Sequence, residues 1–296
     1  MSTKLTLKGV FVPMITPFKE NGEIDEERLR SVTDFLVGEG VHGVIPCGST
    51  GEYVFMSPDE HKRAVKIVVD QVNGRVPVVA GAGSPGTKNA LDLATYAKDV
   101  GAGGILAITP YYHNPTDEGL LEHYRVLAEK GDIPTIVYNL PRVSAYDLNP
   151  ALATRLAEIH NLIGIKDSTW NFAHTMDLIR HAGGKISIVT GYSEYLLPAL
   201  VVGAQGGIMT GANIAPRLHV DLYNAFRKGD MKAASELHHK MMPLMRFMFV
   251  ESNPLIPKKA LDMLGIGGGF CRKPLLSLSK KSEDLLRKIL TDLGML

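Results

Sequence analysis

A lysine near the end of a short apolar run is the residue in this sequence best suited to covalent chemistry. Residues 162–168 are rich in isoleucine, which is typical of a buried strand. Because side chains alternate between the faces of a strand, Gly164 and Lys166 share one face, where the glycine leaves an opening beside the lysine. Ile163 and Ile165 take the other face, which suits packing against helices. An amine in apolar surroundings has a lowered pKa and attacks carbonyl carbons to form a Schiff base. The alternative is a lysine whose ammonium group reaches solvent.

Hydroxyl groups follow several other apolar runs. Ser49 and Thr50 follow one run, Tyr111 and Tyr112 a second, and Tyr138 lies near the end of a third. Each has a purely structural explanation, as a turn residue or a buried aromatic residue. Together with the lysine they form the set that Schiff-base chemistry requires, because protons must move while the carbinolamine loses water and a carbon–carbon bond forms or breaks.

The turn that contains these first two hydroxyls also predicts an anion site. Gly48 and Gly51 flank Ser49 and Thr50, and glycines allow backbone N–H groups to point at a carboxylate. A 2-oxo acid offers a carbonyl for Lys166 and a carboxylate for this turn.

Two other site types have weaker support. Residues 81–86 match the GxGxxG pattern of nicotinamide cofactor binding, with Asp99 downstream. However, Pro85 stiffens the loop, and a dinucleotide fold places this motif in its first strand–helix unit. The ten histidines are scattered, and no HExxH or CxxC spacing indicates a metal site.

These candidate residues require a fold that collects strand ends at one place. Eight apolar, β-rich runs alternate with helical patterns, which favours a parallel (β/α)8 TIM barrel, in which catalytic residues lie at the C-terminal ends of the strands. The predicted strands are residues 9–18, 41–47, 76–80, 104–112, 134–139, 162–168, 186–191 and 207–210.

The helical patterns divide the chain into two parts. A helix is expected to begin after Ser57, which is followed by Pro58 and by Glu60 at the third position. Residues 1–228 are predicted to form the barrel that carries the active site. Residues 229–296 are helical only and are predicted to form a C-terminal extension, in which clustered methionines fill apolar gaps.

Composition excludes several classes of partner. The 32 basic and 31 acidic residues nearly cancel, which argues against nucleic acid. No apolar run approaches the roughly 18 residues that span a membrane, and residues 1–8 lack the apolar segment of a secretory signal. The two cysteines, Cys47 and Cys271, lie far apart, so we expect a cytoplasmic protein without a disulfide framework.

Over nearly its whole length, the sequence resembles the dihydrodipicolinate synthase and N-acetylneuraminate lyase superfamily of class I pyruvate-dependent aldolases. The segments that carry the resemblance are Gly48-Ser49-Thr50-Gly51-Glu52, Thr109-Pro110-Tyr111-Tyr112, Tyr138-Asn139-Leu140-Pro141 and Gly164-Ile165-Lys166-Asp167.

The resemblance implies a role for each matching residue. Lys166 is similar to the Schiff-base lysine, and Tyr138 to the general acid and base beside it. Ser49 and Thr50 resemble the turn that binds the pyruvate carboxylate, with the Ser49 hydroxyl linking the tyrosines. Tyr112 resembles the residue that is lent across a dimer to the neighbouring subunit.

The resemblance also implies the surroundings of the site. Gly191 and Ile208 match positions that line the pyruvate pocket. The expected assembly is a homotetramer, built as a dimer of dimers. The covalent lysine adduct requires no metal or organic cofactor, so the expected ligands are a small-molecule 2-oxo acid and an aldehyde.

The resemblance leaves two possible identities for the second substrate. Residues 249–254 resemble the synthase branch, which condenses pyruvate with aspartate semialdehyde. That branch keeps an arginine for the aldehyde substrate's carboxylate at the position of Val143, whereas this sequence has Arg142 one residue earlier, which is expected to contact substrate. Residues 191–194 and 211–213 instead resemble aldolases or dehydratases of 2-keto-3-deoxy sugar acids.

Further alternatives stay open at this stage. Tyr53, Pro58 and Pro85 replace residues that the synthase branch uses for feedback by lysine, which predicts no inhibition by lysine. The chain could also be a nicotinamide-dependent oxidoreductase, or a non-catalytic binding protein on an inherited barrel.

Overall fold

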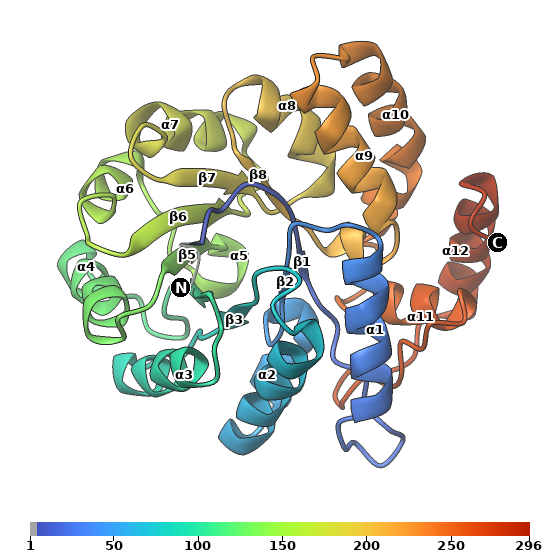
Figure 1. Ribbon diagram of the computed structural model, residues 1–296, viewed down its shortest axis with the longest axis horizontal. Helices are drawn as coiled ribbons and strands as arrows, with labels where there is room; N and C mark the ends of the chain where they lie inside the picture. The colour runs from blue at the N-terminus through green and yellow to red at the C-terminus, as the bar shows by residue number, and fades with distance from the viewer. Residues whose placement is uncertain (1–4) are drawn as a thin grey trace.

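Eight parallel strands form a barrel in the computed structural model, which describes residues 5–296 (Figure 1). The strands neighbour one another in the order β2-β1-β8-β7-β6-β5-β4-β3, and a parallel bridge between Val44 and Val78 joins the two ends. The predicted (β/α)8 barrel is therefore confirmed. The strands are β1 (Gly9–Pro13), β2 (Gly43–Ile45), β3 (Val79–Gly81), β4 (Gly104–Ile108), β5 (Thr135–Asn139), β6 (Leu162–Asp167), β7 (Ser187–Thr190) and β8 (Gly206–Ile208).

Helices surround the strands (Figure 1). The helix expected after Ser57 begins there, with a complete capping box between Ser57 and Glu60. The helices are α1 (Glu26–Gly38), α2 (Pro58–Val72), α3 (Thr87–Asp99), α4 (Asp117–Arg125), α5 (Pro141–Ser144), α6 (Pro150–Leu156), α7 (Phe172–Ala182), α8 (Leu196–Val201), α9 (Pro216–Arg227), α10 (Met231–Phe247), α11 (Leu255–Met263) and α12 (Lys280–Asp292).

The strands differ in extent from the predicted runs, most of all β1 and β4, which end at Pro13 and Ile108, whereas the prediction extended them to residues 18 and 112. β3 begins at Val79, later than expected, because Pro77 has no N–H group for a strand ladder. The Pro77 carbonyl instead accepts a hydrogen bond from Val44 N at 3.1 Å. β8 ends at Ile208, earlier than expected, because the chain turns into a short 3-10 helix at Thr210.

β6 contains an irregularity that alters the predicted faces. Thr135 pairs with Leu162 but Ile136 pairs with Gly164, so Ile163 is skipped in the register. Ile165 faces the helices as expected, whereas Ile163 packs against the cluster inside the barrel, and that part of the prediction is wrong. No opening exists at Gly164 either, since a Cβ there would lie 2.7 Å from the Leu7 side chain, which fills the space.

The C-terminal helices are joined to the barrel by shared packing. α10 places Met241 and Met245 in the large cluster between strands and helices. Leu244 of α10 and Met248, which follows its last residue, lie in a second cluster with α11 and α12. The clustered methionines therefore serve packing, as predicted. The division of the chain at residue 228 stays a prediction.

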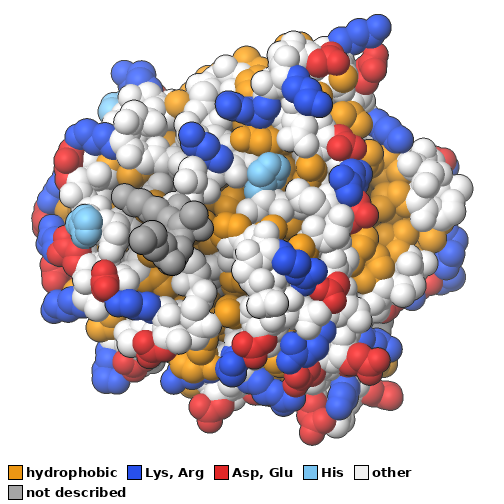
Figure 2. Space-filling view, viewed as in Figure 1, with side chains coloured by type: hydrophobic (Ala, Val, Ile, Leu, Met, Phe, Trp, Pro, Cys, Tyr) orange, Lys and Arg blue, Asp and Glu red, His pale blue; other side chains and the backbone are white. Residues whose placement is uncertain are grey.

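The surface carries mixed charge. On the face shown in Figure 2, acidic and basic side chains alternate around the edge, and no continuous patch of one sign covers it. Among residues 5–296, no helix is long and apolar enough to cross a membrane.

Candidate active site

Lys166 and Tyr138 form a buried pair on neighbouring strands. They lie directly opposite each other in the register of β5 and β6. The lysine Nζ lies 3.8 Å from the centroid of the tyrosine ring. The two residues are only 5% and 8% exposed, so the amine is not directed into bulk water. The structure thus brings together the predicted nucleophile and the predicted acid and base.

The protein lowers the pKa of Lys166. Burial is the main cause, because the ammonium form loses its hydration, and the Tyr138 hydroxyl opposes part of this effect. A larger share of the lysine is therefore neutral at a given pH than in water. A neutral amine is the form that attacks a carbonyl carbon.

A cavity of about 320 Å³ opens above this pair. It is lined by most of the residues that were predicted to contact substrate, and by others from the loops and the C-terminal extension. Predicted residues in the lining are Gly48, Ser49, Thr50, Tyr138, Arg142, Lys166 and Gly191.

Three hydrogen bonds hold the predicted carboxylate turn in place. Ser49–Gly51 forms a short 3-10 helix, closed by a hydrogen bond from Gly51 N to Gly48 O at 2.9 Å. The Thr50 hydroxyl lies 3.0 Å from the Thr210 hydroxyl and accepts a hydrogen bond from Asn253 Nδ2 at 3.1 Å. The Thr50 side chain is therefore fixed by one group from the barrel and one from the extension.

Two predicted pocket residues differ in their placement. Gly191 lines the cavity, and a Cβ at this position would lie 1.8 Å from the Ser168 hydroxyl oxygen. Only glycine therefore fits here without movement of Ser168. Ile208 does not line the cavity, because its side chain is fully buried in the apolar cluster inside the barrel that also contains Tyr138.

Tyr112 is not brought to Lys166 within one chain. It is 89% exposed, has a positive φ of 79°, and its ring contacts His113 edge-on. Tyr111 instead packs against the cluster inside the barrel. Burial and, next, the neighbouring Tyr111 raise the pKa of Tyr53, which the sequence had not assigned to the site.

Arg142 and Val143 both reach the cavity from α5. Both are exposed, and Val143 lies 52% exposed in the lining. Both side chains belong to a single helical turn. An arginine at position 142 instead of position 143 therefore still lies at the cavity.

An aromatic wall adjoins the cavity and was not predicted. Trp170 stacks on Tyr192 with ring centroids 3.9 Å apart, and Phe249 meets both rings edge-on. The buried Tyr192 hydroxyl donates to Ser168 O at 3.1 Å. Reading the last residue of each predicted strand and the residue after it would have found Ser168 and Tyr192.

The extension supplies other residues that sequence reasoning missed. Phe249, Glu251 and Asn253 line the cavity, although they follow no strand. Glu52, which ends the carboxylate turn, pairs with the buried Lys258 of α11. Its other oxygen accepts the backbone N–H of Arg272 at 2.8 Å.

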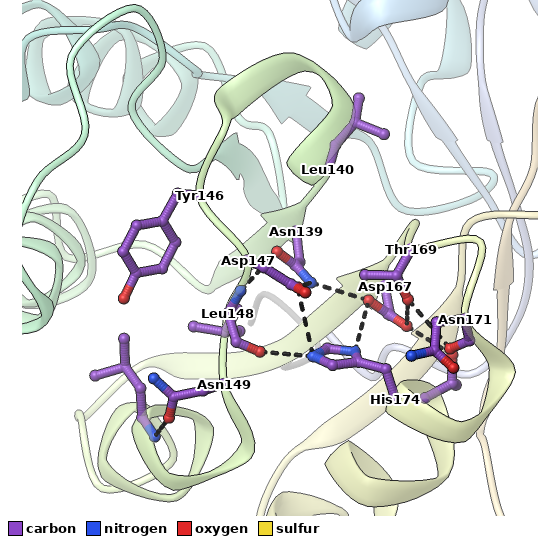
Figure 3. Close-up of polar contacts among 12 residues, drawn as sticks. Asn139, Leu140, Tyr146, Asp147, Leu148, Asn149, Asp167, Thr169, Asn171 and His174 are labelled. Carbon is purple, nitrogen blue, oxygen red and sulfur yellow. Dashed lines mark hydrogen bonds and ion pairs between the residues drawn. The ribbon is translucent and has the colours of Figure 1, made fainter.

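A polar network surrounds Asn139 and Asp167, the next residues after Tyr138 and Lys166 on their strands, and is drawn in Figure 3. Asp167 is buried and accepts hydrogen bonds from Asn139 Nδ2 at 3.0 Å and from the Thr175 hydroxyl at 2.6 Å. His174 of α7 lies beside it, with Nδ1 3.4 Å from an Asp167 oxygen. No sequence motif pointed to this histidine.

The structure gives a packing reason for the glycines of the GxGxxG loop, and it also bears on the metal alternative. The glycines of residues 81–86 allow close packing, since a Cβ at Gly81 would lie 1.9 Å from Cys47 O and one at Gly83 2.6 Å from Ile108. Within residues 5–296, no group of three or more histidine, cysteine or acidic side chains is arranged to hold a metal ion.

Comparison with known proteins agrees with the geometry. The family model described as the dihydrodipicolinate synthetase family matches residues 6–293. The chain is 42% identical over 288 residues to the 4-hydroxy-tetrahydrodipicolinate synthase of Methanothrix thermoacetophila, covering 97% of each chain. It is 41% identical to the enzyme of that name from Acidiphilium cryptum, covering 97% of this chain and 99% of the relative. A solved dihydrodipicolinate synthase from Acinetobacter baumannii, complexed with pyruvate, has a TM-score of 0.95, 35% identity and coverage of 98% and 100%.

Proposed function

The chain belongs to the dihydrodipicolinate synthetase family, and we propose that it condenses pyruvate with aspartate semialdehyde, as a 4-hydroxy-tetrahydrodipicolinate synthase. Relatives of that name at about 40% identity support this reaction and not the 2-keto-3-deoxy sugar acid alternative. The observation that carries the chemistry is the buried Lys166 amine against the Tyr138 ring. The proposed enzyme is a pyruvate-dependent lyase.

The first steps use the lysine and the tyrosine. The neutral Lys166 amine adds to C2 of pyruvate, and the carbinolamine oxygen leaves as water with a proton donated by Tyr138. The resulting iminium ion acidifies the methyl group at C3. Tyr138 takes a proton from C3, and the enamine carbon then attacks the aldehyde carbon of the second substrate. Because the positive charge that stabilises these steps lies on the iminium nitrogen of Lys166 itself, the reaction needs no metal or organic cofactor.

The carboxylates are assigned to two parts of the cavity. We assign the pyruvate carboxylate to Ser49 and Thr50, since the turn is fixed and opens to the cavity. Gly191 leaves room for the Ser168 hydroxyl, and both residues line the cavity that would hold the keto acid. We assign the carboxylate of the semialdehyde to Arg142, because a guanidinium group binds a carboxylate through two hydrogen bonds and valine offers none.

The exposed Tyr112 supports a proposal for the assembly. We propose that Tyr112 contacts the active site of a neighbouring subunit in a dimer, and that two dimers form a homotetramer. The 89% exposure and the left-handed backbone at Tyr112 support this role, because a strained, exposed aromatic residue is otherwise costly. We further propose a cytoplasmic location, supported by the two free cysteines.

Trapping of the covalent intermediate tests the proposed chemistry. Borohydride reduction in the presence of pyruvate is expected to add one three-carbon adduct to the peptide that contains Lys166, identified by mass mapping. The peptide that contains Lys258 is the internal control, because this second buried lysine is paired with Glu52 away from the Lys166 amine. Adduct on several lysines, or on none, contradicts the proposal.

Turnover tests the substrate. The enzyme is expected to consume pyruvate only when aspartate semialdehyde is present, and to release no pyruvate from 2-keto-3-deoxy sugar acids. Cleavage of a sugar acid at a comparable kcat/KM contradicts the assignment of the second substrate while leaving the Schiff base intact.

A further inference from the structure

The strand register builds a second polar pair directly behind the catalytic one. Tyr138 pairs with Lys166, and one residue further along Asn139 pairs with Asp167. Because strands alternate, the second pair points outward from the barrel, away from the cavity. The Asp167 carboxylate is fully buried there and is met by Asn139, Thr169 and Thr175. Asn139 and Asp167 are the members of the network in Figure 3 that belong to the barrel strands.

His174 connects this buried carboxylate to a loop. Its Nε2 lies 2.7 Å from Leu148 O, and because a carbonyl only accepts, Nε2 must carry a hydrogen. Its Nδ1 faces Asp167 Oδ1 at 3.4 Å, and Nε2 also lies 3.6 Å from Asp147 Oδ1. Two carboxylates therefore face the ring, and both favour the doubly protonated, charged imidazolium.

Leu148 is held from both sides of its backbone. Its N–H donates to Asn139 Oδ1 at 3.1 Å, and its carbonyl accepts from His174. The Leu148 side chain is also fully buried. This residue is therefore a fixed point on the chain between β5 and α6.

The segment between the end of β5 and Leu148 carries Arg142, the residue that we assign to the semialdehyde carboxylate. It runs from Leu140 to Asp147 and includes α5, whose single turn presents Arg142 and Val143 to the cavity. A helix of four residues has no stability of its own. Its position must come from tertiary contacts, which are the buried Leu140 after β5, the hydrogen bond from the Tyr146 hydroxyl to Asp117 at 2.6 Å, and the anchored Leu148.

We propose that His174 is a positioning residue, which anchors the loop of residues 140–148 to the outer face of β6 and so fixes where Arg142 meets the aldehyde substrate. The inference rests on the proposed function and adds to it a residue that never touches substrate. It assigns the network a role in binding the second substrate and none in binding pyruvate.

Kinetics of His174→Gln test the proposal. Glutamine keeps one donor for Leu148 O but lacks the charge that pairs with Asp167. The KM for aspartate semialdehyde is expected to rise roughly tenfold, the scale of losing one charged contact, while the KM for pyruvate and borohydride trapping of pyruvate change less than about twofold. Equal loss for both substrates, or no change in either, overturns the proposal.

The matched control is His181→Gln on the same helix. His181 is exposed, and its Nδ1 contacts only Asp177 O of its own helix, at 2.8 Å. This variant is expected to keep wild-type KM values for both substrates. A rise in the semialdehyde KM as large as that of His174→Gln assigns the effect to α7 in general and overturns the specific role.

Hydrogen exchange separates this proposal from the proposed function. Peptides that cover residues 140–148 are expected to exchange at least about tenfold faster in His174→Gln, with peptides from β6 unchanged. This readout needs no substrate, so it stands even if the wild-type enzyme does not use aspartate semialdehyde. Unchanged exchange in the loop overturns the anchoring role.

A second variant covers the case in which His174→Gln does not fold. The Asp147 side chain is 61% exposed, so Asp147→Asn spares the core while it removes one of the two charges that face His174. A severalfold rise in the semialdehyde KM, with the pyruvate KM unchanged, supports the proposal, and an unchanged semialdehyde KM overturns it.

Discussion

At the scale of single residues, the site combines an amine shielded from water with an arginine that is open to it. Lys166 is buried at the floor of the cavity, whereas Arg142 is exposed at its margin. The different surroundings fit different tasks. Shielding keeps part of the lysine neutral, while exposure leaves the guanidinium group available to a dissolved carboxylate.

Removal of the arginine tests this separation. Arg142→Ala is expected to lower kcat/KM for aspartate semialdehyde roughly 10- to 100-fold, as for loss of a charge-assisted carboxylate contact, with trapping of pyruvate at Lys166 unchanged. Steady-state assays with each substrate varied provide the measurement. Arg180→Ala, on the exposed side of α7, is the control. If the arginine variant behaves like this control, another residue binds the semialdehyde.

At the scale of elements, the C-terminal extension completes a site that the barrel begins. Asn253 holds Thr50, while Lys258 and the Arg272 backbone hold Glu52 at the end of the same turn. The Arg272 guanidinium adds bonds to Phe55 O at 2.7 Å and to the Glu60 carboxylate. The extension therefore positions the proposed pyruvate-carboxylate turn together with Thr210 of the barrel.

Breaking the buried ion pair between Lys258 and Glu52 is expected to destabilise the protein measurably. Lys258→Met leaves the Glu52 carboxylate, 1% exposed, without its cation. We expect the free energy of unfolding to fall by about 3–5 kcal/mol and the KM for pyruvate to rise. The double variant Glu52→Gln with Lys258→Met is expected to recover most of the stability.

Urea unfolding and pyruvate kinetics provide the measurements. Lys259→Met is the matched control, since the neighbouring Lys259 is partly exposed and pairs with Glu283 near the surface at 3.2 Å. A single variant as stable as this control shows that the ion pair is not essential for holding the turn.

The sequence predicted the barrel well, and the physical reason is local. Strand and helix positions follow from hydrophobic periodicity and from caps such as Ser57 with Glu60, which act over a few residues. Lys166 and Tyr138 were predicted to lie together because both lie at strand ends. The parts that were missed depend on distant segments. Ile163 follows a register shift set by β5, and Gly164 is covered by Leu7.

The same reason explains which site residues escaped prediction. Asn253 and Phe249 reach the cavity from the extension, and no strand-end rule points to them. His174 follows β6 by several residues and acts through Asp167 and Leu148, which only the folded chain brings beside it. Ile208 was predicted as a pocket residue but lies inside the barrel.

At the scale of the whole molecule, stability is coupled to pH through His174. Burial alone would lower the pKa of this histidine, but the nearby Asp167 carboxylate, with Leu148 O and Asp147, raises it to about 9. Its unfolded value is 6.5. The folded state therefore gains stability that is fully present below pH 6.5 and is lost as the pH rises through 9.

Urea unfolding at several pH values tests this coupling. The wild type is expected to exceed His174→Gln by on the order of 2 kcal/mol near pH 6, and the difference is expected to shrink toward zero at pH 10. Comparison with the variant removes the contribution of other groups that titrate in this range. A difference that stays constant with pH shows that the imidazolium charge does not contribute.

The sequence contains one tryptophan, and it stands in the aromatic wall beside the cavity. In a chain with several tryptophans, indole emission reports an average over many places, but here all of it originates beside one cavity wall. Trp170 is half-exposed and stacks on Tyr192, which lines the cavity. The native, unlabelled chain thus carries its own optical probe, and ligand titrations and stopped-flow traces need no added dye.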